Sequence, residues 1–219
     1  MSLKSKLAVR SLVVISILGS VLFIPAGSFR FWQAWVYIGI LFVPALFAFI
    51  YFYKHDPKSI ERRSLLKEKV PEQKRIMSLI YVMLLVAFLL PGFDYRYGWS
   101  RLPLWLTVLS QVFVLGGILM AYWVVKISRF AARTIQVESG QTVISDGPYR
   151  TIRHPMYLGM CVIFTPLALG SYFALPAFTL LIPLVVLRLL NEEKVLRQEL
   201  AGYNEYCSRT HFRLVPFVW

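Results

Sequence analysis

The chain has 219 residues, of which 58% are hydrophobic, 16% aromatic and only 16% charged. Together with a mean hydropathy of +0.61, this composition excludes a soluble globular domain, because such a domain needs a polar surface around its core. The 24 Lys and Arg residues outnumber the 11 Asp and Glu residues and give a net charge of +13. These basic residues lie in short stretches between long apolar segments, which favours a membrane protein over a nucleic-acid-binding protein.

The apolar segments predict an all-α fold, a polytopic transmembrane bundle of about six membrane helices. They cover residues 7–25, 31–53, 76–93, 103–125 and 158–190. A helix needs about 20 residues to cross the hydrocarbon core of a bilayer, so each of the first four segments predicts one crossing. The last segment is too long for one crossing and is divided by Gly170 and Ser171. It therefore predicts a helical hairpin whose first helix, the fifth of the bundle, is short.

The distribution of Lys and Arg predicts which helix ends face the cytoplasm, because positively charged loops are retained there during insertion. Residues 54–75 hold eight of them, whereas the connections near Arg30 and at residues 94–101 hold few and are predicted to lie outside. The other basic segments, 1–10, 126–153 and 194–213, then also fall on the cytoplasmic side. A cleaved signal peptide is an alternative for the first segment, but the sequence after Pro25 offers no convincing small-residue cleavage site.

Cysteine and histidine usage argues against a disulfide framework and against a metal site. Cys161 and Cys207 are the two cysteines, and we interpret both as packing residues. The three histidines, His55, His154 and His211, are widely scattered, and the sequence has neither a Gly-rich phosphate loop nor an HExxH motif. Hydrolytic metal chemistry is therefore not predicted.

A polar segment at residues 134–157 precedes the hairpin and ends with GPYRTIRHPMYLG. Gly147 and Pro148 predict a turn, and Pro155 predicts the start of a membrane helix. His154 is then placed at a helix N-terminus, where unpaired N–H groups and a partial positive charge bind anionic groups. The alternative is a histidine that simply faces lipid headgroups, as polar side chains at an interface often do.

A second polar cluster lies at the end of the last membrane segment, in RLLNEEKVLRQEL. Arg188 and Glu192 are four residues apart and share one helix face, while Glu193 lies on a neighbouring face. An exposed ion pair that anchors the helix end at the headgroups is one interpretation. However, the hairpin returns this cluster to the side of His154, so we expect the two clusters to face each other across a cleft that forms a site.

These motifs together resemble a known enzyme family. The segment SGQTVISDGPYRTIRHPMYLG, followed by Arg188, by NEE and by the ending Tyr203, Tyr206 and RLVP, is similar to the isoprenylcysteine carboxyl methyltransferase family, and related membrane phospholipid methyltransferases share the pattern. The resemblance covers about residues 122–219. It implies that residues 122–219 form a cofactor-binding half and residues 1–121 the N-terminal transmembrane helices of one integrated membrane domain. It does not by itself fix the lipid substrate.

The resemblance also implies a site for S-adenosyl-L-methionine at the cytoplasmic face. The implied cofactor-binding residues are Gln141, Thr142, Val143, Ile144, Tyr149, His154, Pro155, Met156, Tyr157 and Glu192. Arg188 matches the arginine beside the methyl acceptor, so Arg188 and Glu192 are the implied catalytic residues. Gln141 departs from the pattern, since some relatives carry histidine there, and we expect its backbone to make the contact.

The acceptor follows from chemistry only in part. A carboxylate is already nucleophilic at neutral pH, so a cation such as Arg188 need only orient it, which favours an isoprenylcysteine-like substrate. A protonated phosphatidylethanolamine headgroup must first lose a proton to a base such as Glu192, Glu193 or His154, and it remains the alternative acceptor. Aromatic faces at Tyr149 and Tyr157 suit a sulfonium cation.

A lipid-tethered acceptor predicts an access route between the helices, with Phe164, Phe173 and Phe178 as candidate lining residues; simple packing is their alternative role. Two further functions stay open. Sterol reductases end with a similar helix and Tyr-rich tail, which permits an NADPH-dependent membrane reductase. A non-enzymatic anchor would use the basic loops to hold anionic headgroups. The predicted partners are the membrane and a lipid or prenylated substrate, with no nucleic acid, and the oligomeric state is left open.

Overall fold

The computed structural model describes residues 3–56, 71–128, 137 and 140–219. The α-helices are α1 (Leu3–Ala26), α2 (Trp32–His55), α4 (Pro71–Tyr97), α5 (Leu104–Ile127), α6 (Pro155–Ile163), α7 (Leu175–Thr179), α8 (Leu181–Glu199) and α9 (Tyr203–Arg209), with 3-10 helices η1 (Gly147–Arg150) and η2 (Pro166–Leu169). These residues form no strand, only an isolated bridge between Ile152 and Phe212. The predicted all-α class is confirmed. Parts of the predicted loop 54–75 and of the polar segment 134–157 lie outside the described residues.

Four helical stretches are long and apolar enough to cross a membrane: Trp32–His55, Glu72–Tyr97, Leu104–Ile127 and Leu175–Glu199. The last combines α7 and α8. Two shorter apolar stretches, Ser11–Ala26 and Pro155–Leu169, stand where the first and fifth crossings are predicted. The chain is therefore an integral membrane protein with four candidate spans among its described residues, and the two further crossings remain predictions.

The hairpin of the last apolar block turns at the predicted position. Pro155 begins α6, and the chain passes through η2 to Gly170, whose φ of 75° closes the turn in the left-handed region that glycine adopts without strain. Helix α6 has nine residues, which agrees with the expected short fifth helix. Helix α8 continues past Leu190 to Glu199. The residues after Leu190 keep an amphipathic helical pattern, in which apolar side chains recur on the packed face.

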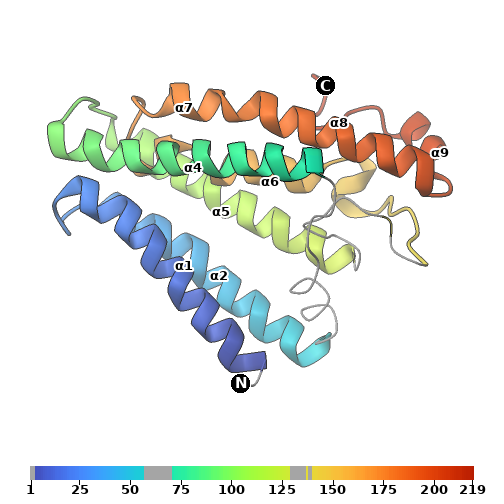
Figure 1. Cartoon of the computed structure of the whole chain (residues 1–219), viewed down its shortest axis with the longest axis horizontal. Coiled ribbons are helices and arrows are strands. Elements are labelled where there is room, and N and C mark those ends of the chain that lie inside the picture. Colours follow the sequence, from blue (N-terminus) through green and yellow to red (C-terminus); the bar gives the residue numbers. More distant parts are fainter. Residues whose placement is uncertain (1–2, 57–70, 129–136, 138–139) are drawn as a thin grey trace.

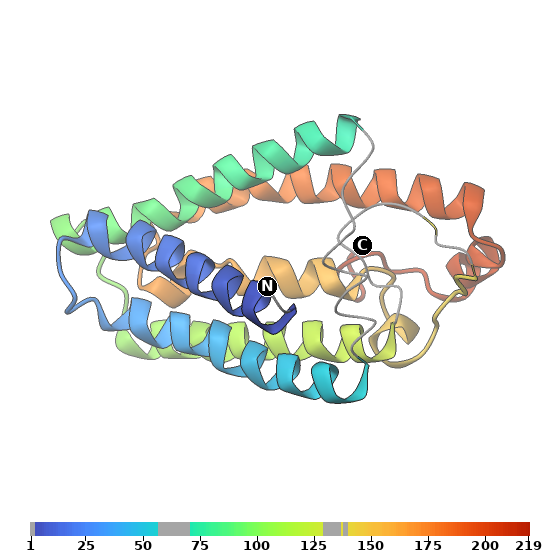
Figure 2. The same ribbon diagram turned by 60° about the horizontal axis from the view of Figure 1, so that its bottom comes forward.

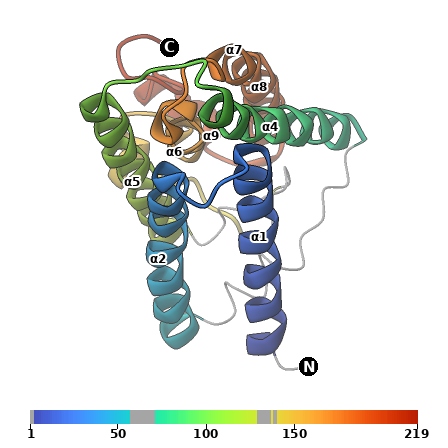
Figure 3. The same cartoon turned by 90° about the vertical axis from the view of Figure 1, so that its left-hand side faces the viewer.

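The helices pack around α6. It lies between α5 on one side and α8 on the other, α4 packs against both α8 and α1, and α2 packs on α5. Figures 1 and 2 show α4 and α8 running together on one side of α6, with α5 on the other. Seen from the end in Figure 3, α1 and α2 extend together away from this group of helices.

Two glycines allow α5 and α6 to approach closely. A Cβ added to Gly117 would lie 3.0 Å from the Gly159 carbonyl oxygen, and a Cβ added to Gly159 would lie 3.1 Å from the Gly117 carbonyl oxygen. Small residues allow membrane helices to pack backbone to backbone, so van der Waals contact replaces the hydrophobic effect that lipid cannot supply. Tyr37 of α2 adds to this packing, because its hydroxyl donates a 2.6 Å hydrogen bond to the Ile163 carbonyl at the end of α6.

One end of the bundle carries the connections α1–α2 and α4–α5 and the hairpin turn. Its exposed aromatic side chains include Phe29, Trp32, Trp35, Tyr95, Tyr97, Trp99, Trp105, Tyr172 and Phe173. Such a group is typical of a membrane–water interface. Inside the same end, buried Asp94 accepts hydrogen bonds from the Ser171 hydroxyl and, at 2.6 Å, from the Ser100 N–H. These bonds tie the end of α4 to the hairpin turn, and the other end of the bundle carries the polar residues.

Candidate active site

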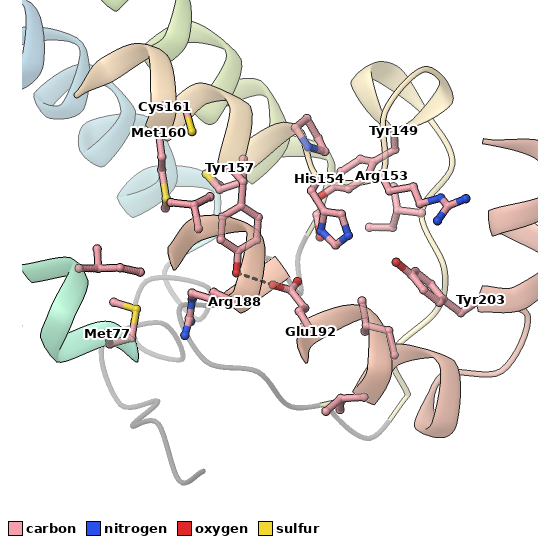
Figure 4. A pocket seen from close by; sticks show the side chains of 18 of the residues that line it. Met77, Tyr149, Arg153, His154, Tyr157, Met160, Cys161, Arg188, Glu192 and Tyr203 are labelled. Carbon is pink, nitrogen blue, oxygen red and sulfur yellow. Dashed lines mark hydrogen bonds between the residues drawn. The ribbon is translucent and has the colours of Figure 1, made fainter. Parts of the chain in front are cut away.

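A cavity of about 340 Å³ lies at the polar end of the bundle, between α4, α6, α8, η1 and α9. Figure 4 shows its lining side chains. All the residues that the sequence suggested for cofactor and acceptor line it: Gln141, Thr142, Val143, Ile144, Tyr149, His154, Pro155, Met156, Tyr157, Arg188 and Glu192. The hairpin thus brings the two polar clusters of the sequence together around one space, as expected from the return of the last helix.

The start of α6 is joined to the C-terminal tail by the backbone. The N–H groups of Arg153 and His154 donate 2.9 Å hydrogen bonds to the carbonyls of Phe212 and Arg213. His154 is the N-cap residue of α6 and is 5% exposed. Its Nε2 atom lies 3.4 Å from Glu193 Oε1. A histidine buried in this way does not face headgroups, so that interpretation of His154 is wrong.

Glu192 and Arg188 project from one face of α8 into the cavity, as their spacing predicted. The Tyr157 hydroxyl donates a 2.6 Å hydrogen bond to Glu192 Oε2 and so connects α6 with α8. Figure 4 shows the Arg188 side chain next to this pair. Arg188 is 7% exposed, so the interpretation of Arg188 and Glu192 as an exposed interfacial ion pair is also wrong. The arginine lies inside the protein because α4 covers it.

Gln73 is a residue of this site that the sequence did not reveal. It lies in the first turn of α4, is 2% exposed, and its Oε1 accepts a 3.1 Å hydrogen bond from Arg188. The contact joins residues 115 positions apart. A single glutamine at the start of an apolar helix carries no motif, so only the packing of α4 on α8 identifies its partner. Met77, Ile80 and Leu84 of the same helix line the cavity.

Arg153 fixes the tail against the mouth of α6 with all three of its guanidinium nitrogens. Nε donates to the Thr210 carbonyl at 2.7 Å, one terminal nitrogen to the Cys207 carbonyl at 3.0 Å, and the other to Glu193 Oε1 at 3.0 Å. Glu193 also accepts a 3.1 Å hydrogen bond from Arg213 Nε. The described lining residues do not include Glu193. Glu193 is therefore engaged in structural ion pairs and is poorly placed to act as a base.

Helix α9 closes the cavity at the end farthest from α4. Tyr203 and Tyr206 line it, and with Leu200 and Cys207 they form an apolar cluster against Val143, Tyr149 and Leu196. The Tyr206 hydroxyl donates a 2.7 Å hydrogen bond to the Tyr149 carbonyl. Burial raises the pKa of both the Tyr203 and Tyr206 hydroxyls above the usual value for tyrosine. Both hydroxyls therefore keep their protons at neutral pH and act as donors.

The cavity continues as an apolar channel between α4, α6 and α8. Its walls are Met77, Ile80, Leu84, Met160, Cys161, Phe164, Phe178, Leu181, Ile182 and Val185. Phe164 and Phe178 thus lie on the suggested route. Phe173 is a correction, because it is absent from the described lining and packs on Trp99, with ring centroids 4.7 Å apart, at the opposite end of the bundle. Its place directly after the hairpin turn explains this position.

The cysteines lie in apolar surroundings, as expected for packing residues. Cys161 lines the apolar channel, Cys207 lies in the α9 cluster, and both sulfurs are free. Within the part of the chain that the structure describes, no group of three His, Cys, Asp or Glu side chains is arranged to hold a metal ion. The polar side chains that line the cavity are those of Ser128, Gln141, Thr142, Arg153, His154, Arg188, Glu192 and several tyrosines.

Comparison with known families adds an independent finding. Residues 107–198 match the model of the isoprenylcysteine carboxyl methyltransferase family. The matched region begins in α5, includes η1, α6, η2 and α7, and ends near the end of α8. It therefore contains all the suggested cofactor residues together with Arg188 and Glu192, whereas α4 and α9 lie outside it. The match agrees with the resemblance to this family that the sequence motifs indicated.

Proposed function

We propose that this chain, which matches the isoprenylcysteine carboxyl methyltransferase family over residues 107–198, transfers a methyl group from S-adenosyl-L-methionine to the carboxylate of a lipid-tethered acceptor. The observation that carries the proposal is a single cavity with two ends of different character. One end is polar and lies against Glu192 and Tyr203, and the other is an apolar channel that passes Phe164 and Phe178. A soluble cofactor and a lipid chain are the two ligands that such a cavity suits.

The polar end fits the proposed cofactor. When bound there, S-adenosyl-L-methionine supplies a methyl group on a cationic sulfur. Glu192 provides a partly buried carboxylate for amino or hydroxyl groups, and Tyr149 and Tyr157 provide aromatic faces for a cation. Tyr203 provides a buried hydroxyl for which the described residues contain no hydrogen-bond partner. A ligand with several polar groups and one positive charge satisfies these features together.

Arg188 is the residue that we assign to the acceptor. Its guanidinium lies where the polar end of the cavity meets the apolar channel, and Gln73 holds it there. A guanidinium in this position orients a carboxylate through charge-assisted hydrogen bonds. Methylation of a carboxylate converts an anion and a sulfonium cation into a neutral ester and a neutral thioether, so no proton has to be removed. The reaction therefore needs alignment of the reactants and no general base. This agrees with the ion pairs that hold Glu193 away from the cavity.

The apolar channel gives the lipid part of the acceptor a place beside α6. Its walls come from α4, α6, α7 and α8, the helices that surround the acceptor arginine. Phe164 and Phe178 line the channel. A prenyl chain in this channel stays in an apolar environment while its headgroup reaches Arg188, so transfer of the chain from lipid costs little free energy.

We assign the cavity to the cytoplasmic side of the membrane. Lys54 lies in the last turn of α2, Lys74 and Arg75 in the first turns of α4, and Lys126 in the last turn of α5, all at the end of the bundle that holds the cavity. The connection between α2 and α4 carries most of the eight basic residues of segment 54–75. Trp32, Trp35, Trp99 and Trp105 are exposed at the other end, whereas Trp123 is exposed at the cavity end of α5. The excess of positive charge supports a cytoplasmic cavity.

A labelled-methyl assay tests the proposal. Purified protein in detergent is incubated with S-adenosyl-L-methionine tritiated in the methyl group and with N-acetyl-S-farnesylcysteine. A carboxyl methyl ester releases volatile labelled methanol in alkali, which is the expected result. A parallel incubation uses phosphatidylethanolamine vesicles, because a methylated amine keeps its label in alkali. Label that stays in phospholipid overturns the carboxylate acceptor. Absence of cofactor binding by calorimetry, or oxidation of NADPH by the protein, overturns the methyltransferase assignment.

A further inference from the structure

We propose that Tyr203 is a further cofactor-binding residue, whose hydroxyl donates a hydrogen bond to the part of the bound cofactor that lies farthest from Arg188. This inference rests on the proposed function and extends the site to α9. Tyr203 lies beyond the region that matches the family model, which ends at residue 198. The C-terminal tail is then part of the binding site and not only a support for it.

The state of the Tyr203 hydroxyl carries the argument. Tyr203 is 4% exposed, its oxygen is fully buried, and within the described part of the chain it has no hydrogen-bond partner. A buried polar group without a partner is destabilising, so native proteins pair nearly all of them. The neighbouring Tyr206 hydroxyl follows that rule through its bond to Tyr149. The unpaired hydroxyl of Tyr203 belongs to a residue that lines the cavity, so a ligand in the cavity can supply the missing acceptor.

The direction of the side chain agrees with this role. Figure 4 shows the Tyr203 ring with its oxygen pointing into the cavity, toward the space beside Glu192 and His154. Because burial keeps the phenol protonated, this oxygen presents a donor to that space. The ring itself packs in the apolar cluster with Leu200 and Val143, so the hydroxyl is its one polar group.

The order of residues along α8 places Tyr203 at the cofactor end. Arg188, Glu192 and Leu196 are successive members of one helix face, and each step of four residues rises about 6 Å. Arg188 marks the acceptor, Glu192 follows, and Leu196 packs in the cluster that contains Tyr203. A cofactor that extends along this face from a methyl group near Arg188 reaches Tyr203 with its other end.

Tyr203 is also held rigidly before any ligand binds. Arg153 bonds to the carbonyls of Cys207 and Thr210 at the end of α9, and Tyr206 bonds to the Tyr149 carbonyl. A donor that is already fixed loses little conformational entropy when the ligand arrives. The contact therefore contributes to affinity with little offsetting cost.

Replacement of Tyr203 by phenylalanine tests the role, with S-adenosylhomocysteine as the calorimetric probe in detergent. We expect the dissociation constant of Tyr203→Phe to rise roughly three- to tenfold, and its melting temperature without ligand to stay equal or rise, because the substitution removes an unpaired buried group. In turnover, the KM for S-adenosyl-L-methionine should rise by a similar factor while the KM for the acceptor stays unchanged. A residue with a purely structural role would not change the two KM values differently.

Tyr37→Phe is the matched control, since it removes a hydroxyl that is bonded to the Ile163 carbonyl and lies outside the described lining of the cavity. We expect it to lower the melting temperature and to leave the dissociation constant unchanged. An unchanged dissociation constant in Tyr203→Phe, or a rise in the acceptor KM instead of the cofactor KM, overturns the role of Tyr203 alone. Absence of binding by the unmodified chain overturns the proposed function and this role with it.

Discussion

The Tyr157 hydroxyl donates a 2.6 Å hydrogen bond to Glu192, 35 residues further along the chain. The two residues belong to the two polar clusters of the sequence, one before the hairpin and one after it. Their contact fixes the orientation of the Glu192 carboxylate relative to α6. In the proposed enzyme this carboxylate receives polar groups of the cofactor, so its geometry is set before the cofactor binds.

Glu192→Gln should weaken cofactor binding by about tenfold, because a charged hydrogen-bond partner is replaced by a neutral one of the same shape. The glutamine oxygen can still accept the bond from Tyr157, so the fold should be preserved. Calorimetry with S-adenosylhomocysteine measures the effect. Glu199→Gln, at an exposed position of α8, is the control and should bind normally. Equal affinities in the two variants contradict the role of Glu192.

Arg188→Ala should lower kcat by about 100-fold while the dissociation constant of the cofactor stays within about twofold of the unmodified value. The reason is that Arg188 is assigned to the acceptor carboxylate and contributes to alignment more than to cofactor binding. Arg197→Ala removes a half-exposed arginine from the same helix and should change neither quantity. A parallel loss of turnover and cofactor affinity in Arg188→Ala contradicts the separation of roles between Arg188 and Glu192.

Gln73 should behave as a positioning residue that acts through Arg188. Gln73→Leu removes the acceptor of the 3.1 Å hydrogen bond, so we expect a several-fold rise in the KM for the acceptor with no change in the KM for the cofactor. Gln73→Glu restores an acceptor but neutralises the guanidinium, so the KM for a carboxylate acceptor should rise further. Steady-state kinetics with both substrates varied separates these results. A lower acceptor KM in Gln73→Glu is the result that the proposed role forbids.

Arg153→Met should destabilise the protein by about 3 to 5 kcal/mol, because it leaves Glu193 and two tail carbonyls without their buried partner. Arg213→Met removes a more exposed partner of the same carboxylate and should cost less than about 1 kcal/mol. Thermal unfolding in detergent measures both, and limited proteolysis should show release of the tail in Arg153→Met first. Similar stability losses in the two variants would show that burial of Arg153 has no special importance.

Ser171→Ala should lower stability by about 1 to 3 kcal/mol, because buried Asp94 loses a hydrogen-bond donor at the aromatic end of the bundle. This end lies away from the cavity, so the dissociation constant of the cofactor should not change. Ser78→Ala is the control for loss of a serine hydroxyl, because Ser78 lies on the exposed face of α4 and its hydroxyl donates to the Lys74 carbonyl of the same helix. A selective loss of cofactor affinity in Ser171→Ala would contradict the separation of the two ends.

Much of this architecture could be predicted from the sequence, because lipid imposes simple length rules on apolar segments. The uncharged run before Lys54 and the Gly170–Ser171 break each correspond to a helix boundary in the structure. Arg188 and Glu192 could be placed on one face because a helix repeats every 3.6 residues. The hairpin then places these two residues on the same side of the membrane as the residues around His154.

The remainder depended on packing that no local pattern encodes. Gln73 contacts Arg188 because α4 packs on α8 in one particular register, and side-chain packing along both helices sets that register. In the sequence, Arg153 and Glu193 cannot be told apart from the other polar residues of the two clusters. They form a structural ion pair because the C-terminal tail returns to the start of α6. Phe173 was misplaced because an aromatic residue near a turn has no periodic pattern that indicates its neighbours.

The backbone contact between Gly117 and Gly159 restricts how the cavity can widen. With carbonyls already at the distance where an added methyl group would clash, α6 has no room to retreat toward α5. In the proposed enzyme, we expect any widening that admits the hydrocarbon chain of the acceptor to come from outward displacement of α4 or α8. The distance between spin labels on α4 and α8 should then increase when the hydrocarbon chain enters. The distance between labels on α5 and α6, near Gly117 and Gly159, should stay constant.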